Sequence, residues 1–112
     1  MEAAIDLRRY ITSEGKDFFG EWLAKLQDAR AQAKIVTRID RAALGNFADC
    51  KRLRSGLWEL RIDWGPSYRV YYTMPGQFCV LLLAGGDKRK QASDIDRALE
   101  YLKDYRKRVR PV

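Results

Sequence analysis

The sequence predicts an α+β domain in layers, with a helical hairpin packed on an antiparallel sheet and a final helix at the edge of the sheet. Apolar residues recur at helical spacing before residue 45, alternate with a period of two between residues 57 and 73, and return to helical spacing after residue 93. A chain of 112 residues is too short for a second core, so we expect one domain over residues 1–112.

The N-terminal part predicts one strand and two helices. Residues 3–12 contain β-branched and aromatic side chains, and the pair Arg8-Arg9 favours an edge strand. Residues 15–26 and 28–44 each have one apolar face, and Gly45 is placed as a C-terminal cap for the second helix. We expect the two helices to form an antiparallel hairpin.

Two strands are predicted at residues 57–64 and 67–73, joined by the turn Gly65-Pro66-Ser67. Two registers keep their apolar faces together. One places Arg61 opposite Tyr71 and Asp63 opposite Arg69, whereas the other places Arg61 directly opposite Arg69. Because like charges directly opposite each other are destabilising, we expect the first. In both registers Arg61 and Arg69 project from one open face, about 5–8 Å apart.

The C-terminal part predicts an interior strand and a helix. Residues 78–84 are apolar on both faces, and the strand is expected to end at the turn Gly85-Gly86. Ser93 and Asp96 have the spacing of a capping box that begins the final helix. The apolar stripe of this helix consists of Ile95, Ala98, Leu99, Leu102, Tyr105 and Val109.

The positive charge of the chain is concentrated in its second half. Residues 1–50 carry eight basic and eight acidic side chains, whereas residues 51–112 carry fourteen and seven, for a net charge of +7. A polyanionic partner is therefore expected to bind the second half, although a charge that serves only solubility is the alternative. The basic residues expected around the open sheet face are Lys51, Arg52, Arg54, Arg61, Arg69, Lys88, Arg89 and Lys90.

These residues suit the binding of a phosphate. The planar guanidinium group of arginine matches phosphate oxygens, and lysine acts as a movable point charge. Metal-free RNA cleavage needs such cations at the phosphate, a base for the 2′-hydroxyl group and an acid for the 5′-oxygen. Lys88 or Lys90 is a candidate for proton transfer, and Tyr71 for stacking on RNA. The alternative is that each basic residue is an ordinary solvated charge.

Several classes of protein and site are excluded. The chain has no histidine, which excludes catalytic triads that use one. Its only two cysteines lack CxxC spacing, so a structural zinc site is excluded as well. We expect no cofactor. The sequence shows neither a signal peptide nor a run of about 20 apolar residues, so we expect a cytoplasmic protein without a membrane span.

Two segments carry a resemblance to a known family: LWELRIDWGPSYRVYYTM, and VLLLAGGDKRKQASDIDRALEYLKDY after it. They resemble the RelE/ParE superfamily, specifically the HigB-like branch of addiction module killer proteins. The resemblance implies a RelE-like (microbial RNase-like) fold. It also implies phosphate-contacting or catalytic roles for Arg61, Arg69 and Arg89. Together with Lys88 these are the four residues expected to be catalytic, and the residues expected to bind RNA are Lys51, Arg52, Arg54, Tyr71 and Lys90. Two positions depart from RelE, because Glu59 replaces a lysine and Ile95 replaces a tyrosine.

The resemblance further implies a type II toxin–antitoxin system with a cognate antitoxin, expected to be a small helix-turn-helix protein. The leading hypothesis is a metal-independent endoribonuclease that cleaves mRNA on the ribosome and so inhibits translation. Operator DNA would be bound only indirectly, through the antitoxin. The alternatives are a ParE-like toxin that inhibits gyrase without cleaving nucleic acid, or a corepressor module bound to the antitoxin.

Overall fold

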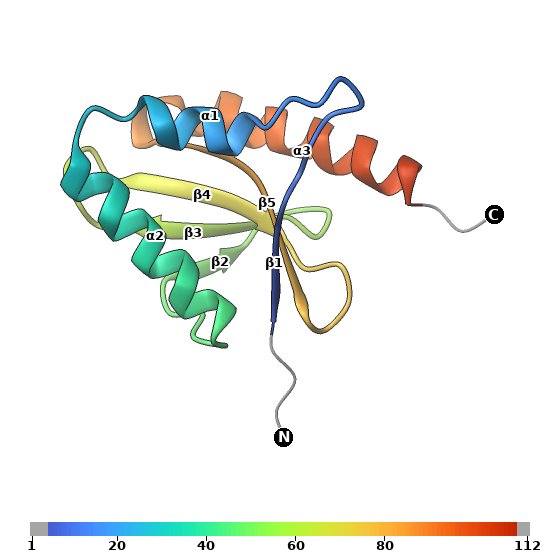
Figure 1. The fold of residues 1–112 in the computed structure, drawn as a ribbon, viewed down its shortest axis with the longest axis horizontal. Coiled ribbons are helices and arrows are strands. Elements are labelled where there is room, and N and C mark those ends of the chain that lie inside the picture. Colours follow the sequence, from blue (N-terminus) through green and yellow to red (C-terminus); the bar gives the residue numbers. More distant parts are fainter. Residues whose placement is uncertain (1–4, 110–112) are drawn as a thin grey trace.

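The computed structural model describes residues 5–109, which form a twisted sheet with helices on both sides (Figure 1). The elements in chain order are β1 (Asp6–Arg9), α1 (Phe18–Lys25), α2 (Ala29–Ala43), β2 (Cys50–Arg52), β3 (Trp58–Ile62), β4 (Tyr68–Thr73), β5 (Cys79–Asp87), the 3₁₀ turn η1 (Lys88–Lys90) and α3 (Gln91–Arg108). Within this range five strands form one sheet in the order β1-β5-β4-β3-β2, which confirms the α+β class. None of the described helices has both the length and the apolar character needed to cross a membrane.

The first strand lies at an edge of the sheet, as expected, and residues 3–4 of the predicted segment lie outside the described residues. Two features of the sheet differ from the prediction. β1 pairs with β5 in parallel, whereas the other pairs are antiparallel. In addition, Lys51 and Arg52 belong to a strand, β2, whose three residues are too few to show a sequence pattern.

Both N-terminal helices begin at an aspartate that caps them. The Asp17 side chain accepts a hydrogen bond from the Gly20 amide at 2.9 Å, and the Asp28 side chain accepts one from the Arg30 amide at 2.9 Å. Gly45, with a φ of 92°, follows the end of α2 in the left-handed conformation that glycine favours. The expected hairpin of these two helices is not confirmed, since α1 packs mainly on β5 and α2 on β3, and Gln32 of α2 donates hydrogen bonds to the carbonyl oxygens of Leu23 and Leu26 (Figure 1).

The two faces of the sheet carry separate apolar cores. On one face, Phe19 from α1 and Ile35 from α2 pack against Leu60, Val70 and other strand residues. On the other face, α3 packs its apolar stripe against a second set of buried residues, comprising Leu57 just before β3 and Tyr71, Leu81, Leu83 and Ala84 of β4 and β5. The expectation of a final helix at the edge beside an open sheet face is therefore wrong, since α3 covers most of that face.

The register of β3 and β4 is the one that the sequence argued against, because Arg61 lies directly opposite Arg69. Like charges oppose each other here at little cost, since the two side chains have different surroundings. Arg61 is exposed, whereas Arg69 is buried and paired with Glu59. The buried carboxylate of Glu59 neutralises Arg69, and this outweighs the repulsion expected between two arginines directly opposite each other.

The strand β5 extends through Gly85 and Gly86, which were expected to form a turn. Both glycines lie under larger side chains. A Cβ atom at Gly85 would overlap the indole ring of Trp22, and one at Gly86 would overlap the carboxylate of Asp94. The glycine pair therefore lets a helix on each face approach the strand closely.

The C-terminal helix begins earlier than the capping-box prediction. The Asp87 side chain accepts a hydrogen bond from the Arg89 amide at 2.9 Å and so caps η1, from which α3 continues at Gln91. Ser93 lies inside the first turn of α3, where its hydroxyl donates to the carbonyl oxygen of Lys90. The chain thus passes from β5 into the helix without the expected loop.

Candidate functional site

Three of the predicted basic residues meet at a hollow beside the end of β3 and the start of β4. This hollow, called the arginine hollow below, has a volume of about 510 Å³ and is lined by Asp49, Arg61, Asp63, Ser67, Arg69 and Lys88. It thus brings together three of the four predicted catalytic residues. Arg61 and Arg69 come from the paired strands, and Lys88 comes from the start of η1.

Arg69 is held in place by groups beneath the hollow. Its Nε lies 3.6 Å from Oε1 of Glu59, and its Nη1 donates a hydrogen bond of 3.1 Å to the carbonyl oxygen of Ser67. Oε2 of Glu59 accepts a hydrogen bond of 2.9 Å from Nε2 of Gln91 in α3. Since the Arg69 and Glu59 side chains are only 8% and 2% exposed, the ion pair fixes the guanidinium group at the wall of the hollow.

Glu59 is a functional candidate that the sequence argument missed. It was noted only as a departure from RelE, yet a signal was present in the alternation of the strand. Glu59 shares a face with Arg61 and Arg69, and a carboxylate beside two arginines is the natural counter-ion of one of them.

The expectation that Tyr71 stacks on RNA is wrong. Tyr71 is fully buried beneath α3, and its hydroxyl group has no hydrogen-bond partner among the described residues. Burial, together with the nearby carboxylates of Glu59 and Asp94, raises the pKa of Tyr71 well above its ordinary value. The side chain is therefore neither a base-stacking surface nor a proton donor at neutral pH.

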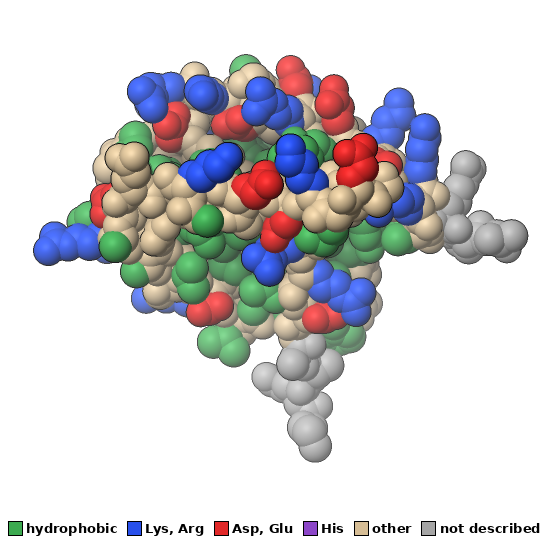
Figure 2. All heavy atoms as spheres, turned by 45° about the horizontal axis from the view of Figure 1, so that its top comes forward, with side chains coloured by type: hydrophobic (Ala, Val, Ile, Leu, Met, Phe, Trp, Pro, Cys, Tyr) green, Lys and Arg blue, Asp and Glu red, His purple; other side chains and the backbone are tan. Residues whose placement is uncertain are grey.

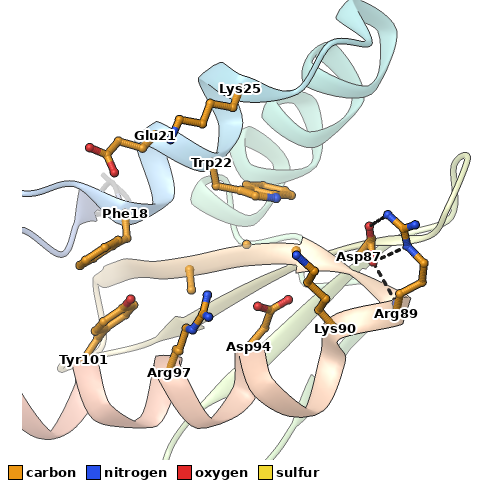
Figure 3. Close-up of a pocket in the computed structure, with 13 residues that line it drawn as sticks. Phe18, Glu21, Trp22, Lys25, Asp87, Arg89, Lys90, Asp94, Arg97 and Tyr101 are labelled. Atoms are coloured by element: carbon orange, nitrogen blue, oxygen red, sulfur yellow. Dashed lines mark hydrogen bonds and ion pairs between the residues drawn. The ribbon is translucent and has the colours of Figure 1, made fainter.

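The basic run Lys88-Arg89-Lys90 is divided between two hollows. Lys88 lines the arginine hollow, whereas Arg89 and Lys90 line a second hollow between α1 and α3 (Figure 3). Arg89 pairs with Asp87, with Nη2 and Oδ2 3.0 Å apart, and this pair lowers the pKa of the Asp87 carboxyl. The expected convergence of Arg89 with Arg61 and Arg69 is thus not observed.

The second hollow contains aromatic and charged side chains of both signs. Trp22 lies above the β5 glycines and Asp94 rises from α3 on the opposite side (Figure 3). Asp94 is 7% exposed, and its Oδ2 has no hydrogen-bond partner among the described residues. Burial raises the pKa of this carboxyl, although Arg97 and Lys90 oppose the change.

The remaining predicted RNA-binding residues lie apart from the arginine hollow. Lys51 and Arg52 are exposed on the edge strand β2. Arg54 pairs with Asp96 of α3, with Nη2 and Oδ1 3.2 Å apart, on an exposed surface. These residues can extend a basic surface, but they do not line the hollow.

The arginine hollow combines groups that bind an anion with groups that accept a proton. Arg61, Arg69 and Lys88 supply the cations, and the carboxylates of Asp49 and Asp63 are proton acceptors that the sequence argument did not consider. Among residues 5–109, no group of three or more histidine, cysteine or acidic side chains is placed to hold a metal ion.

Comparison with known proteins identifies the family. Residues 21–103 match the family model described as phage derived protein Gp49-like. The chain belongs to the Gp49-like family. An uncharacterized protein of Haemophilus influenzae is 50% identical over 80 residues, which are 71% of this chain and 81% of the relative.

The fold of this Gp49-like protein is that of RelE. A solved structure of the E. coli toxin RelE, an arginine-to-alanine double mutant in the free state, matches with a TM-score of 0.63. The match covers 88% of this chain and 97% of RelE, at 13% sequence identity. The family match and the shared fold together confirm the resemblance to the RelE superfamily of toxins.

Proposed function

We propose that this Gp49-like protein is the toxin of a type II toxin–antitoxin system and that it cleaves mRNA on the ribosome, which inhibits translation. The observation that carries the proposal is the arginine hollow, where Arg61, Arg69 and Lys88 face two carboxylates. Membership in the Gp49-like family and the RelE fold support the toxin assignment. The HigB-like branch and a cytoplasmic location stay predictions.

The hollow offers each group that metal-free RNA cleavage requires. A carboxylate of Asp49 or Asp63 takes the proton of the 2′-hydroxyl group, and the 2′-oxygen then attacks the adjacent phosphorus. The bond from phosphorus to the 5′-oxygen breaks, and Lys88 donates a proton to that oxygen. Arg61 and Arg69 stabilise the negative charge that develops on the phosphate oxygens. The products are a 2′,3′-cyclic phosphate and a 5′-hydroxyl end.

The proposed partners follow from this chemistry. The substrate is mRNA held on the ribosome, and a cognate antitoxin neutralises the toxin. We expect this antitoxin to be a small helix-turn-helix protein that is acidic where it covers the arginine hollow. Operator DNA would be contacted through the antitoxin only.

The test is to map mRNA ends after brief expression of the wild type, Arg61→Ala and Lys88→Ala. Both side chains are exposed, so their removal is expected to leave the fold intact. New 5′ ends are expected with the wild type and about 10²–10³-fold fewer with either variant, the usual effect of removing one group that stabilises transition-state charge. Lys103→Ala, an exposed lysine of α3 outside the hollow, is the matched control and should cleave like the wild type.

Two outcomes would contradict the nuclease. Intact transcripts together with DNA breaks or stalled replication would identify the gyrase-directed alternative. Harmless expression of the wild type would contradict the toxin assignment itself. Arg69→Ala is a poor test, because it leaves Glu59 as an unpaired buried charge and would inactivate the protein by unfolding it.

A further inference from the structure

The helix α2 gathers its basic side chains on one side. The first half of the chain has no net charge, yet α2 contains four basic residues and a single acidic one, Asp40. At 100° per residue, Arg30, Lys34, Arg38 and Arg41 fall within an arc of about 80°. Asp40 projects from another side of the helix. The balanced composition of this half therefore conceals a basic face.

This basic face borders the arginine hollow directly. Lys34, Arg38 and Arg41 line a hollow of about 450 Å³ between α2 and the end of β3. Asp49, Arg61 and Asp63 line both this hollow and the arginine hollow, so the two are continuous. A basic trough thus runs from Arg41 and Lys34 past Arg61 to Lys88.

Two of the α2 side chains are positioned by contacts that leave their charge available. Arg38 donates a hydrogen bond through Nη2 to the carbonyl oxygen of Ala48. The Lys34 ammonium group lies 4.4 Å from the ring centroid of Trp64, a cation–π contact. Arg41 is exposed on the last turn of the helix.

The positive charges of the trough lack local neutralisation. Among the described residues, the ion pairs within 4.0 Å involve none of Lys34, Arg38, Arg41 and Arg61. Asp49 and Asp63 are the acidic side chains of its lining, against six basic ones, of which Arg69 is paired with Glu59. On the face of the molecule shown in Figure 2, by contrast, basic and acidic side chains are interspersed.

We propose that the α2 face is a second phosphate-binding subsite, which holds the backbone of a single RNA strand whose reactive phosphate occupies the arginine hollow. The choice of RNA rests on the proposed function. Lys34 and Arg41 are seven residues apart, about 10 Å along the helix axis at 1.5 Å per residue, so the subsite spans more than one phosphate. Repeated cations along a trough match a continuous phosphate backbone.

The test measures binding without cleavage. The probe is a fluorescent 12-nucleotide RNA with 2′-O-methyl groups, which the proposed mechanism cannot cut, and fluorescence anisotropy gives its affinity for the full-length protein at several salt concentrations. The variant is Lys34→Ala/Arg41→Ala. Its matched control is Lys103→Ala/Lys107→Ala, which removes the same charge from exposed lysines of α3. Thermal melting of each variant verifies that the fold is intact.

The wild type is expected to bind with an affinity that falls steeply with salt. In the α2 variant the slope of log affinity against log salt should decrease by about 1.4, at about 0.7 for each lost single-strand phosphate contact. The α3 control should keep the wild-type slope. An unchanged slope in the α2 variant, an equal decrease in the control, or no RNA binding by the wild type would each overturn the subsite.

The subsite and the nuclease can fail separately. If the slope decreases as expected but no mRNA is cut during expression, the subsite stands and the proposed cleavage does not. If mRNA is cut but the α2 variant binds the probe like the wild type, the nuclease stands and the subsite is wrong.

Discussion

At the scale of single residues, Glu59 changes how the arginine site is understood. The two strand arginines are not equivalent, because Arg69 has a buried carboxylate partner and Arg61 has none among the described residues. Glu59 in turn receives a hydrogen bond from Gln91, so α3 contributes to the position of Arg69. The anion site is therefore built from one face of the β3–β4 pair and from the helix that covers this face.

We predict that Glu59→Ala destabilises the fold by about 3–5 kcal/mol, because it leaves Arg69 as an uncompensated buried charge. Urea denaturation gives the free energy of unfolding. Asp96→Ala removes the carboxylate of an exposed ion pair with Arg54 and is the matched control, for which we expect about 0–1 kcal/mol. Equal effects of the two substitutions would show that the Glu59–Arg69 pair is not a structural requirement.

Asp94 gives a prediction for the dependence of stability on pH. Burial raises the pKa of its carboxyl in the folded state, so the folded protein binds a proton more readily than the unfolded chain. The resulting penalty on folding is present above the folded-state pKa and disappears as the pH falls below the unfolded value of about 3.9. Asp94→Asn is therefore expected to be more stable than the wild type at pH 7.

The measurement is urea denaturation of both proteins between pH 7 and pH 3. The advantage of Asp94→Asn should shrink as the pH falls through the raised pKa. A variant that is less stable at pH 7 would show that the ion-pair attraction of Arg97 and Lys90 exceeds the penalty of burial.

At the scale of elements, the sequence predicted the helices and strands well where one periodicity continues over a whole segment. The second helix, expected at residues 28–44, is Ala29–Ala43, and the strands around residues 58–62 and 68–73 are present. The sequence-based predictions are wrong at positions whose conformation depends on side chains of another helix or strand. The Gly85-Gly86 pair remains in β5 because Trp22 and Asp94 cover it, and no local pattern reveals that cover.

The same reason limited prediction of the site. Arg61, Arg69 and Lys88 could be assigned to one anion site from the strand alternation and the basic turn. The separation of Arg89 from them depends on Asp87, which caps the turn and binds the Arg89 side chain. The burial of Tyr71 depends on where α3 packs, which the sequence placed at the edge of the sheet rather than over its face.

Close packing of α1 on β5 predicts the effect of a small substitution. Gly85→Ala would place a methyl group where it overlaps the indole ring of Trp22. Because of this overpacking, we expect the free energy of unfolding to fall by about 1–3 kcal/mol. Thermal or urea denaturation measures the loss. In the Trp22→Ala background the same substitution should lose much less stability, and equal losses in both backgrounds would contradict the proposed contact.

At the scale of the whole molecule, one sheet serves two cores and exposes its functional groups at one end. The helices α1 and α2 bury one face, and α3 buries the other. The basic trough, which includes the arginine hollow, lies beyond these cores, where the strands β3 and β4 meet the turn of η1. Substitutions of the exposed trough residues Lys34, Arg41 and Arg61 are therefore expected to change binding of nucleic acid with little effect on stability.

Over the described residues the sheet is open rather than closed on itself, so its two outer strands, β1 and β2, form free edges. β1 and β2 contain four and three residues, and most of their side chains are charged and exposed, with Asp6, Arg8 and Arg9 on one edge and Lys51 and Arg52 on the other. Short, charged edges disfavour pairing with strands of other molecules. The longest and most apolar strand, β5, is enclosed between β1 and β4, so the described sheet presents these short charged edges to other molecules.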